Sequence, residues 1–449
     1  MLQSAAAGSQ GSSDRLPISQ EMLLAARRPA RATIASRPTS SLSHVVCLFS
    51  AVSLLAGTTL VAEDWPQFLG PNRDGAYAGP ALADSWPEDG PARVWTKRVG
   101  QGFAGPVVAD GRLILFHRSR NLEVIEALDA LTGRTQWNHE YVTAYRDDFG
   151  FDEGPRSVPV VADGRVYTFG AQGRLHALDL ETGRVLWSED THRRFNVRKG
   201  FFGAAGSPLV QGGRVLVNVG GRDAGIVAFD AETGDVLWTS TDDEASYSSP
   251  VGATFDGRRS GVFFTRTGLV AVDPATGSVR FEMRWRSRLG SSVNAATPLI
   301  IDDLIFLSST YGTGAVTLRV SGNELTRLWA SDDAMSNHYA NSVYHDGYLY
   351  GYHGRQEFNP SFRAVGLRTG RVRWSEDRFR AGTVTLAGDR LLILRETGEL
   401  ILADASPDRF RPIARAQVLD SPVRAYPALA NGYLYARNEN TLICLDLRP

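Results

Sequence analysis

The feature that most constrains the fold of this chain is a short motif that recurs along most of it. One copy, ALDLETGRVLW, runs from Ala177 to Trp187 and joins an Asp, a Thr-Gly pair and a closing aromatic residue. Related segments close at other aromatic residues, namely Trp137, Trp238, Phe281 and, in a looser copy, Trp374. Repeats with a period of roughly 20–50 residues are typical of solenoids and propellers, so the repeat outweighs any domain count drawn from length.

A hairpin pattern precedes the copies of this motif, with two short apolar runs joined by a two-residue turn. The eight turns are Asp110-Gly111, Asp163-Gly164, Gly212-Gly213, Asp256-Gly257, Asp302-Asp303, Asp346-Gly347, Gly388-Asp389 and Asn431-Gly432. Each unit therefore predicts strand, tight turn, strand, loop, strand, Thr-Gly turn and strand. Four short antiparallel strands per unit are typical of a propeller blade. We expect an all-β protein, an eight-bladed β-propeller of four-stranded antiparallel blades.

The last unit ends in TLICLDLRP and has no fourth strand of its own. The segment ARVWTKRV, around Trp95, is a spare strand near the start of the repeat region. We expect it to complete the final blade, because both chain ends then lock the ring and two open sheet edges disappear. A seven-bladed ring would leave one hairpin without a blade.

The recurring Asp and Trp residues are interpreted as structural. The Asp can accept hydrogen bonds from backbone N–H groups of the turn, the Gly adopts a positive φ, and the outer-strand Trp buries a large ring against the next blade. The residues expected to dock neighbouring blades are Asp129, Trp137, Asp179, Trp187, Asp230, Trp238, Asp273, Trp329, Trp374 and Trp95.

Residues 1–62 differ from the repeat region. The segment 45–62 is an uncharged apolar run that follows several arginines and precedes Glu63. This order is that of a secretory signal peptide, with a true start at Met22 or later. We expect a leader over 1–62 with its apolar core at 45–62, and a propeller over 63–449. The protein is then exported, periplasmic or secreted; the alternative is an uncleaved membrane anchor.

The chain has two cysteines, Cys47 and Cys444. Removal of the leader leaves one, so no intrachain disulfide is expected and the hydrophobic core alone must stabilise the fold. Cys444 alternates with apolar neighbours and is expected to be buried in a strand.

The A-x-D-x-x-T-G-x-x-x-W pattern resembles the repeats of pyrroloquinoline-quinone (PQQ) propellers, a group that contains quinoprotein alcohol dehydrogenases and the outer-membrane assembly factor BamB. The segment DWPQFLGPNRDG, residues 64–75, is similar to the start of secreted PQQ-like propellers. The resemblance covers nearly all of residues 64–449. It implies the propeller fold strongly and function weakly, because one fold supports many activities.

The chain departs from both kinds of relative. Quinoprotein dehydrogenases bring adjacent cysteines, a calcium site and, in some members, C-x-x-C-H; none of these motifs is visible in the sequence. The lipid-attached Cys that the BamB resemblance implies at the mature N-terminus is also missing. Membrane tethering and membership of an assembly complex are therefore not expected from this resemblance.

Charge and the remaining motifs exclude several function classes. The formal net charge of −1 gives no indication of nucleic acid or of an anionic membrane as partner. There is no G-x-S-x-G, P-loop or H-E-x-x-H motif. His338, His345 and His353 fall in one blade, but their spacing fits no metal template, so surface or hydrogen-bonding roles are favoured.

Long loops between the strands point to one face of the ring, and function is often carried by such loops on a rigid scaffold. We expect the central channel to be rimmed on this face by Arg156, Asn294, His338, Asn341, Arg355, Glu357 and Arg424. This set suits a small polar or anionic ligand; the alternative is a network that holds the blades together. The acidic segment with Asp147, Asp148, Asp152 and Glu153 is a solvated loop or, alternatively, a calcium loop.

The sequence therefore favours a monomeric, non-catalytic secreted or envelope propeller that binds an envelope protein or a small ligand through its loop-rich face. No catalytic residue, metal or cofactor is expected. The first alternative is a divergent PQQ-dependent alcohol dehydrogenase that uses PQQ with calcium. The second is an extracellular carbohydrate- or polymer-binding module, which exposed Trp or Tyr side chains on the loop face would indicate.

Overall fold

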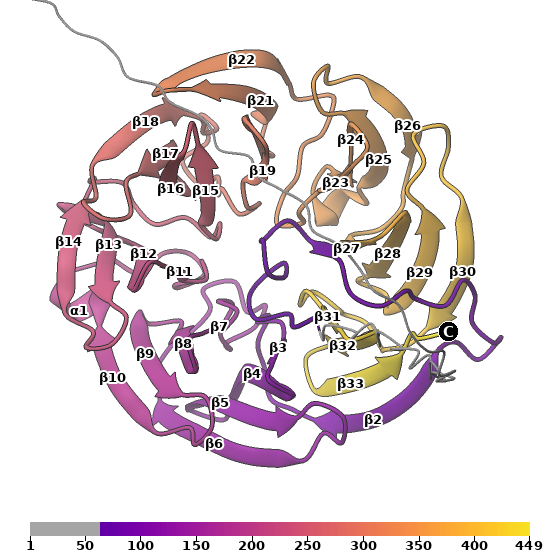
Figure 1. Ribbon diagram of the computed structural model, residues 1–449, viewed down its shortest axis with the longest axis horizontal. Helices are drawn as coiled ribbons and strands as arrows, with labels where there is room; N and C mark the ends of the chain where they lie inside the picture. The colour runs from indigo at the N-terminus through magenta and orange to yellow at the C-terminus, as the bar shows by residue number, and fades with distance from the viewer. Residues whose placement is uncertain (1–62) are drawn as a thin grey trace, which may run out of the picture. The chain divides into compact units, whose positions relative to one another are not determined.

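The computed structural model describes residues 63–449, which form eight sheets arranged as blades around a central axis (Figure 1). The four strands of each blade pair antiparallel with their neighbours. The predicted eight-bladed β-propeller is confirmed. The predictions for the leader, residues 1–62, lie outside the described residues. Among residues 63–449, no helix has the length and hydropathy needed to cross a membrane.

The first four blades follow the chain, each from its innermost to its outermost strand. The strands of the first and second blades are β3 (Val107–Ala109), β4 (Arg112–Ser119), β5 (Leu122–Asp129), β6 (Thr135–Val142), and β7 (Val160–Ala162), β8 (Arg165–Phe169), β9 (Arg174–Asp179), β10 (Val185–Asp190). Those of the third and fourth are β11 (Leu209–Gln211), β12 (Arg214–Gly221), β13 (Ala224–Asp230), β14 (Val236–Ser240), and β15 (Val251–Phe255), β16 (Arg258–Phe264), β17 (Gly268–Val272), β18 (Val279–Arg284).

The remaining blades repeat this order. The fifth and sixth contain β19 (Leu299–Ile301), β20 (Leu304–Ser309), β21 (Gly314–Ser321), β22 (Glu324–Ser331), and β23 (Val343–His345), β24 (Tyr348–His353), β25 (Ser361–Gly366), β26 (Val372–Glu376). The seventh and eighth contain β27 (Gly382–Ala387), β28 (Arg390–Arg395), β29 (Glu399–Asp404), β30 (Pro412–Gln417), and β31 (Ala428–Ala430), β32 (Tyr433–Arg437), β33 (Thr441–Asp446). Two short helical turns interrupt the loops, α1 (Thr191–Arg194) and η1 (Gln356–Phe358).

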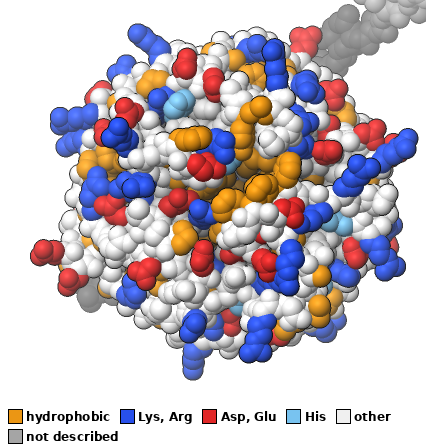
Figure 2. Space-filling view, turned by 180° about the vertical axis from the view of Figure 1, so that it is seen from behind, with side chains coloured by type: hydrophobic (Ala, Val, Ile, Leu, Met, Phe, Trp, Pro, Cys, Tyr) orange, Lys and Arg blue, Asp and Glu red, His pale blue; other side chains and the backbone are white. Residues whose placement is uncertain are grey.

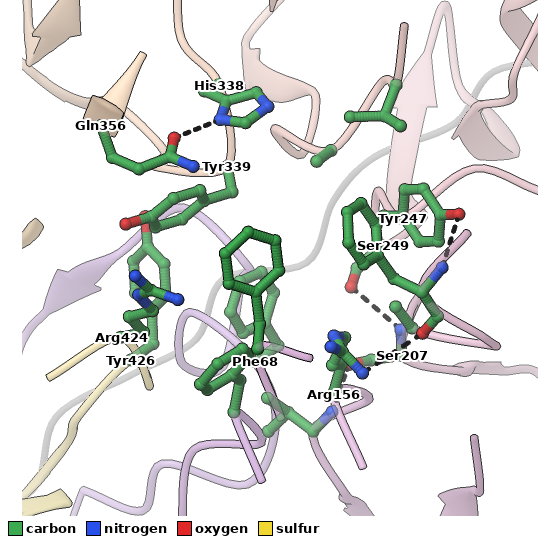
Figure 3. Close-up of a pocket in the computed structure, with 17 residues that line it drawn as sticks. Phe68, Arg156, Ser207, Tyr247, Ser249, His338, Tyr339, Gln356, Arg424 and Tyr426 are labelled. Carbon is green, nitrogen blue, oxygen red and sulfur yellow. Dashed lines mark hydrogen bonds between the residues drawn. The ribbon is translucent and has the colours of Figure 1, made fainter. Parts of the chain in front are cut away.

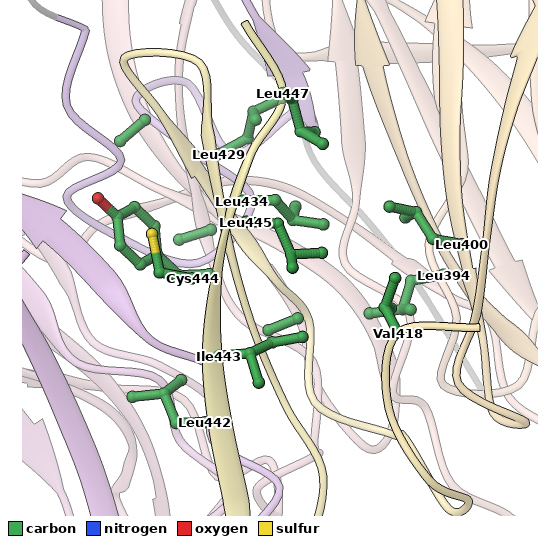
Figure 4. Packing of buried hydrophobic residues seen from close by; sticks show 14 of the residues in the cluster. Leu394, Leu400, Val418, Leu429, Leu434, Leu442, Ile443, Cys444, Leu445 and Leu447 are labelled. Atoms are coloured by element: carbon green, nitrogen blue, oxygen red, sulfur yellow. The ribbon is translucent and has the colours of Figure 1, made fainter. Parts of the chain in front are cut away.

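The ring closes as the sequence predicts. Strand β2 (Ala92–Arg98) pairs with β33 and completes the eighth blade, with Trp95 opposite Cys444. Cys444 is fully buried. Side chains of the seventh and eighth blades, among them Leu394 and Leu442, pack together beside it (Figure 4). Each fully buried side chain of this kind stabilises the fold by about 1.5–3 kcal/mol.

Tight turns join the first two strands of the blades. In the first blade Asp110 and Gly111 have φ values of 49° and 71°. Two successive positive values are typical of the type I′ turn, whose twist matches that of the flanking strands. An Asp-Gly or Asn-Gly pair can therefore define a hairpin through local sequence alone.

The Trp residues named in the sequence contact the next blade through both the ring and its N–H group. In the second blade, Gly183 lies in the Thr-Gly turn. The Asp179 carboxylate closes this turn by accepting a 2.8 Å hydrogen bond from the Thr182 backbone N–H. The ring of Trp137, from the first blade, covers Gly183 so closely that an added Cβ would lie 2.5 Å from ring atoms. The Trp137 Nε1–H group also donates to the Leu180 carbonyl at 2.9 Å.

The same contact recurs around the ring. The other donor–acceptor pairs are Trp95 to Ala130, Trp187 to Ala231, Trp238 to Pro274, Trp329 to Leu367 and Trp374 to Ser406. The Asp129, Asp230 and Asp273 carboxylates accept from backbone N–H groups of their own turns. Phe281 lacks an N–H group and packs edge-on against Phe255.

The segment 64–75 crosses the centre of the ring, a position that the sequence analysis did not foresee (Figure 1). Trp65 forms a bridge with Val108 of the first blade. The fully buried Arg73 donates to the carbonyls of Pro250, at 2.6 Å, and Pro208. Strand β1 (Ala76–Tyr77) then pairs in parallel with β27 of the seventh blade. Asp64 accepts a hydrogen bond from the Asp110 backbone N–H, and Tyr77, just after the segment, accepts one from Gly432, so this part of the chain lies toward the face of the tight turns.

Candidate functional site

A cavity of about 190 Å³ lies in the central channel (Figure 3). Most of its lining residues come immediately before the innermost strand of a blade, where the chain turns from the rim toward the axis. The aromatic side chains of its wall are Phe68, Phe103, Phe151, Phe202, Tyr247, Tyr339 and Tyr426. The polar ones are Arg156, Ser207, Ser249, His338, Gln356 and Arg424. Aromatic walls with a few polar groups are typical of small-molecule sites.

Arg156, one of the predicted rim residues, is on the cavity wall but is already engaged. Its guanidinium donates to the carbonyl of Asp152 at 3.1 Å and to the Tyr145 hydroxyl at 3.3 Å. It lies 5.3 Å from the ring centroid of Phe103 and 5.5 Å from that of Phe202. Arg156 therefore holds the aromatic wall in place through cation–π contacts and hydrogen bonds.

Arg424, also predicted, occupies the other side of the cavity. Its Nε donates to the Glu396 carboxylate at 3.0 Å, and its guanidinium lies 5.5 Å from the Phe103 centroid. Tyr339 donates its hydroxyl to the same carboxylate. Burial and the neighbouring charge of Glu396 raise the pKa of Tyr339 well above its usual value, so this hydroxyl keeps its proton. The two terminal nitrogens of Arg424 make no hydrogen bond to another residue of 63–449, and they remain available to an anion.

His338 lines the cavity, with both ring nitrogens in hydrogen bonds. Nε2 lies 2.8 Å from the Tyr311 hydroxyl, and Nδ1 contacts the Gln356 side-chain oxygen. Burial lowers the pKa of His338, which favours the neutral ring. His338 therefore acts as a fixed polar wall of the cavity.

Two predicted rim residues are instead part of the contacts between blades. Asn294 is buried and donates to the Thr265 carbonyl at 2.9 Å. Asn341 is buried and accepts from the Thr297 backbone N–H at 2.6 Å. Neither lines the cavity. Both amides satisfy backbone groups that the packing of blades removes from water, a common role of buried polar side chains.

Arg355 and Glu357 lie beside the cavity rather than in its wall. They pair with each other at 2.9 Å, and the Arg355 guanidinium stacks 4.8 Å from the Tyr311 ring centroid. The residue between them, Gln356, lines the cavity in their place. The loop was identified from the sequence, but the side chain that faces the axis was not.

The acidic loop offers little to a cation. Asp152 accepts from the backbone N–H groups of Gly154 and Gly102, at 2.6 and 3.1 Å. Asp148 pairs with Lys199 at 2.5 Å, and Glu153 with Arg146 at 2.9 Å. Within residues 63–449 no group of three or more His, Cys, Asp or Glu side chains is placed to hold a metal ion. A calcium ion takes several oxygen ligands, and the carboxylates of Asp148, Asp152 and Glu153 are already engaged by neighbouring groups.

Phenylalanines that the sequence analysis did not select lie in the cavity wall and on the loops beside it. Phe149, Phe151, Phe201 and Phe202 form an aromatic cluster with centroid distances between 5.2 and 6.4 Å. Phe149 and Phe151 are 55% and 49% exposed, and Phe358 of a neighbouring loop is 75% exposed. Figure 2 shows hydrophobic side chains gathered at the centre of one face, with charged side chains around them. The signal for this cluster was the paired aromatics within the two long loops at 144–157 and 193–203.

Comparison with known proteins places these features in a family. The family model described as outer membrane protein assembly factor BamB matches residues 123–376. The quinohemoprotein alcohol dehydrogenase ADH-IIG of Pseudomonas putida is 30% identical over 236 residues, 46% of this chain and 31% of that protein. The quinone-type alcohol dehydrogenase subunit of Komagataeibacter europaeus is 32% identical over 141 residues, 30% of this chain and 18% of that one. This chain thus spans less than a third of either curated relative.

Solved structures share the fold at low identity. BamB from Moraxella catarrhalis aligns with a TM-score of 0.57 and 16% identity, covering 79% of this chain and 96% of that one. Quinohemoprotein alcohol dehydrogenase from Comamonas testosteroni aligns with a TM-score of 0.60 and 15% identity, covering 86% and 81%. These similarities show the fold and no more, because one propeller architecture supports unrelated functions.

Proposed function

Because this chain belongs to the PQQ-like propeller repeat family, we propose that it is a non-catalytic binding or assembly scaffold that engages its ligand or partner through the loop-rich face. The observation that carries this proposal is the coincidence of the aromatic cavity with the exposed Phe149, Phe151 and Phe358 on the loops around it. Contiguous exposed apolar side chains on a monomeric protein commonly mark an interaction surface.

A second candidate, a quinone-dependent alcohol dehydrogenase, is favoured by the names of the curated relatives. The aromatic walls of the cavity suit a planar molecule. Within residues 63–449 no group of three or more His, Cys, Asp or Glu side chains could hold a metal ion, and the buried Cys444 has no adjacent cysteine in the sequence. The scaffold proposal is therefore preferred.

The carbohydrate-binding alternative depends on exposed Trp or Tyr side chains. Within residues 63–449 the large exposed aromatic side chains are the phenylalanines named above. Phe lacks the polar group with which Trp and Tyr bind at wet surfaces. This favours an apolar or aromatic group as the binding partner over a sugar.

We also propose that residues 1–62 are a leader that is cleaved, which would put the propeller, residues 63–449, in the periplasm or outside the cell. N-terminal sequencing of the protein recovered from separated cell fractions tests this proposal. A mature start near Glu63 in the exported fraction is expected; an intact leader in the membrane fraction would favour the anchor.

Site-specific photo-crosslinking in cells tests the scaffold proposal. A photoreactive amino acid at Phe149 or Phe358 should give discrete adducts. The matched controls, Leu237 on β14 and Val279 on β18, are 46% and 44% exposed on outer strands and should give none. Equal labelling from all four positions would contradict a dedicated loop-face surface. Calcium-dependent PQQ binding with dye reduction by alcohols would instead establish the dehydrogenase.

A further inference from the structure

The size of the cavity limits what it can hold. It measures about 190 Å³, and a cavity of about 150 Å³ lined by apolar side chains is known to bind benzene. One aromatic ring with a small substituent at each end therefore fills it.

The walls favour a flat ring. Phe202 and Tyr247 lie edge to face, with centroids 5.4 Å apart, and Phe68 and Tyr426 do so at 5.0 Å. Figure 3 shows Phe68, Tyr247 and Tyr426 around a common space. An aromatic guest gains from stacked and edge-to-face contacts with such walls in addition to the burial of its surface.

One end of the cavity carries the guanidinium of Arg424, which is paired with Glu396. Arg424 is held by Glu396 through Nε alone, so its two terminal nitrogens can meet a carboxylate end-on. Arg156, across the cavity, has each of its terminal nitrogens in a hydrogen bond already, and Asp147 lies 3.7 Å away. The cavity thus presents one available guanidinium, which matches a ligand with a single carboxylate.

The opposite wall presents two hydroxyl groups, those of Ser207 and Ser249 (Figure 3). Both serines are buried, and each hydroxyl accepts one backbone N–H, from Val158 and Ser207 respectively, at 3.0 Å. Neither donates a hydrogen bond to another residue of 63–449 in the structure. A serine hydroxyl can donate one bond and accept two, so each has a proton free for a guest oxygen.

From these features we propose that the cavity binds a single-ring aromatic carboxylate with a hydroxyl group on the ring, of the hydroxybenzoate class. The carboxylate lies against Arg424, the ring between the aromatic walls, and the ring hydroxyl against Ser207 and Ser249. This inference rests on the proposed binding function, because it names the ligand of the same face.

Isothermal titration calorimetry of the full chain tests it with 4-hydroxybenzoate, its methyl ester, benzoate and cyclohexanecarboxylate. The acid should bind more tightly than the ester or the non-aromatic acid. Arg424→Gln should weaken 4-hydroxybenzoate binding by about ten-fold or more and leave the ester unchanged, since a charge-assisted hydrogen bond is lost. Ser207→Ala with Ser249→Ala should weaken 4-hydroxybenzoate binding and spare benzoate.

Arg411→Gln, at a residue whose side chain is 59% exposed and which does not line the cavity, is the matched control and should bind as the unchanged protein does. Equal affinity of acid and ester for the unchanged protein, or no binding of any acid at millimolar concentration, would overturn the inference, and this comparison needs no variant. Loop-face adducts in the crosslinking experiment together with no acid binding would refute the ligand class and leave the scaffold proposal standing.

Discussion

Gly183→Ala probes the contact that joins neighbouring blades. At φ 70° an L-residue is in the left-handed region, and its Cβ would lie 2.5 Å from two ring atoms of Trp137. Gly164, in the tight turn of the same blade, has φ 71° and nothing within 4 Å of its Cβ position. The two glycines therefore differ in the clash and share the backbone strain.

The magnitudes follow from that difference. Left-handed backbone costs an L-residue about 1–2 kcal/mol, which is the whole effect expected for Gly164→Ala. Forcing a ring out of a packed position adds about 1–3 kcal/mol, so Gly183→Ala should destabilise the propeller by about 2–5 kcal/mol. Removal of the ring with Trp137→Ala should reduce the further cost of Gly183→Ala to that of Gly164→Ala.

Denaturant unfolding of the four variants, completed as a double-mutant cycle, measures these terms. The expected coupling between Gly183→Ala and Trp137→Ala is about 1–3 kcal/mol. Equal destabilisation by Gly183→Ala and Gly164→Ala, or a coupling near zero, would refute the view that the Trp ring over the Thr-Gly turn fastens the blades.

Three further predictions concern the centre of the ring, the third strand of the second blade and the closure of the ring. Arg73→Met should lower the free energy of unfolding by about 3 kcal/mol, because two buried carbonyls lose their donor. Thermal unfolding measures this loss, with Arg73→Lys compared in parallel. An unchanged Tm would contradict the role of Arg73 in holding the segment at the centre of the ring. Burial, helped by the charge of His139, lowers the pKa of His176 to about 3. The folded state therefore resists protonation of His176, and the contribution of this residue to stability is full above about pH 6.5 and is lost as the pH falls toward 3. In urea unfolding at pH 4 to 7, His176→Gln should flatten the dependence of the unfolding free energy on pH. Equal pH dependence in the variant and the unchanged protein would refute this prediction. A chain that begins at Gly100 lacks β2 and should associate through the open edge of β33. A chain that begins at Asp89 keeps β2 and should remain monomeric in light scattering. If both truncated chains are monomeric, closure by β2 is dispensable.

The blade count could be predicted because its signals are local. A positive φ at Asp110 and Gly111 depends on the chemistry of two residues, and five of the other seven turns share it. Eight hairpin turns with one spare strand at Trp95 allow one closed ring. The contacts of Trp137 with the next blade follow from the same regularity, since every unit presents its turn to its neighbour.

The site depended on distances that only the closed ring defines. Arg156, Asn294, Asn341 and Arg424 all precede or lie near an innermost strand, yet two face the cavity and two face the adjoining blade. Which way such a side chain points is decided by the packing angle between blades, and the sequence carries no local sign of it.

The position of the segment 64–75 also depends on the closed ring. Its residues contact Val108, Pro250 and Leu386, which lie far apart along the chain and meet only once the ring is complete. The sequence by itself determined the fold class, the number of blades and the strand that closes the ring, because turn geometry and strand alternation act over a few residues. The tertiary structure decided which end of the channel is covered, which arginine keeps its terminal nitrogens without a hydrogen-bond partner, and how large the cavity is. These properties depend on contacts across the whole ring.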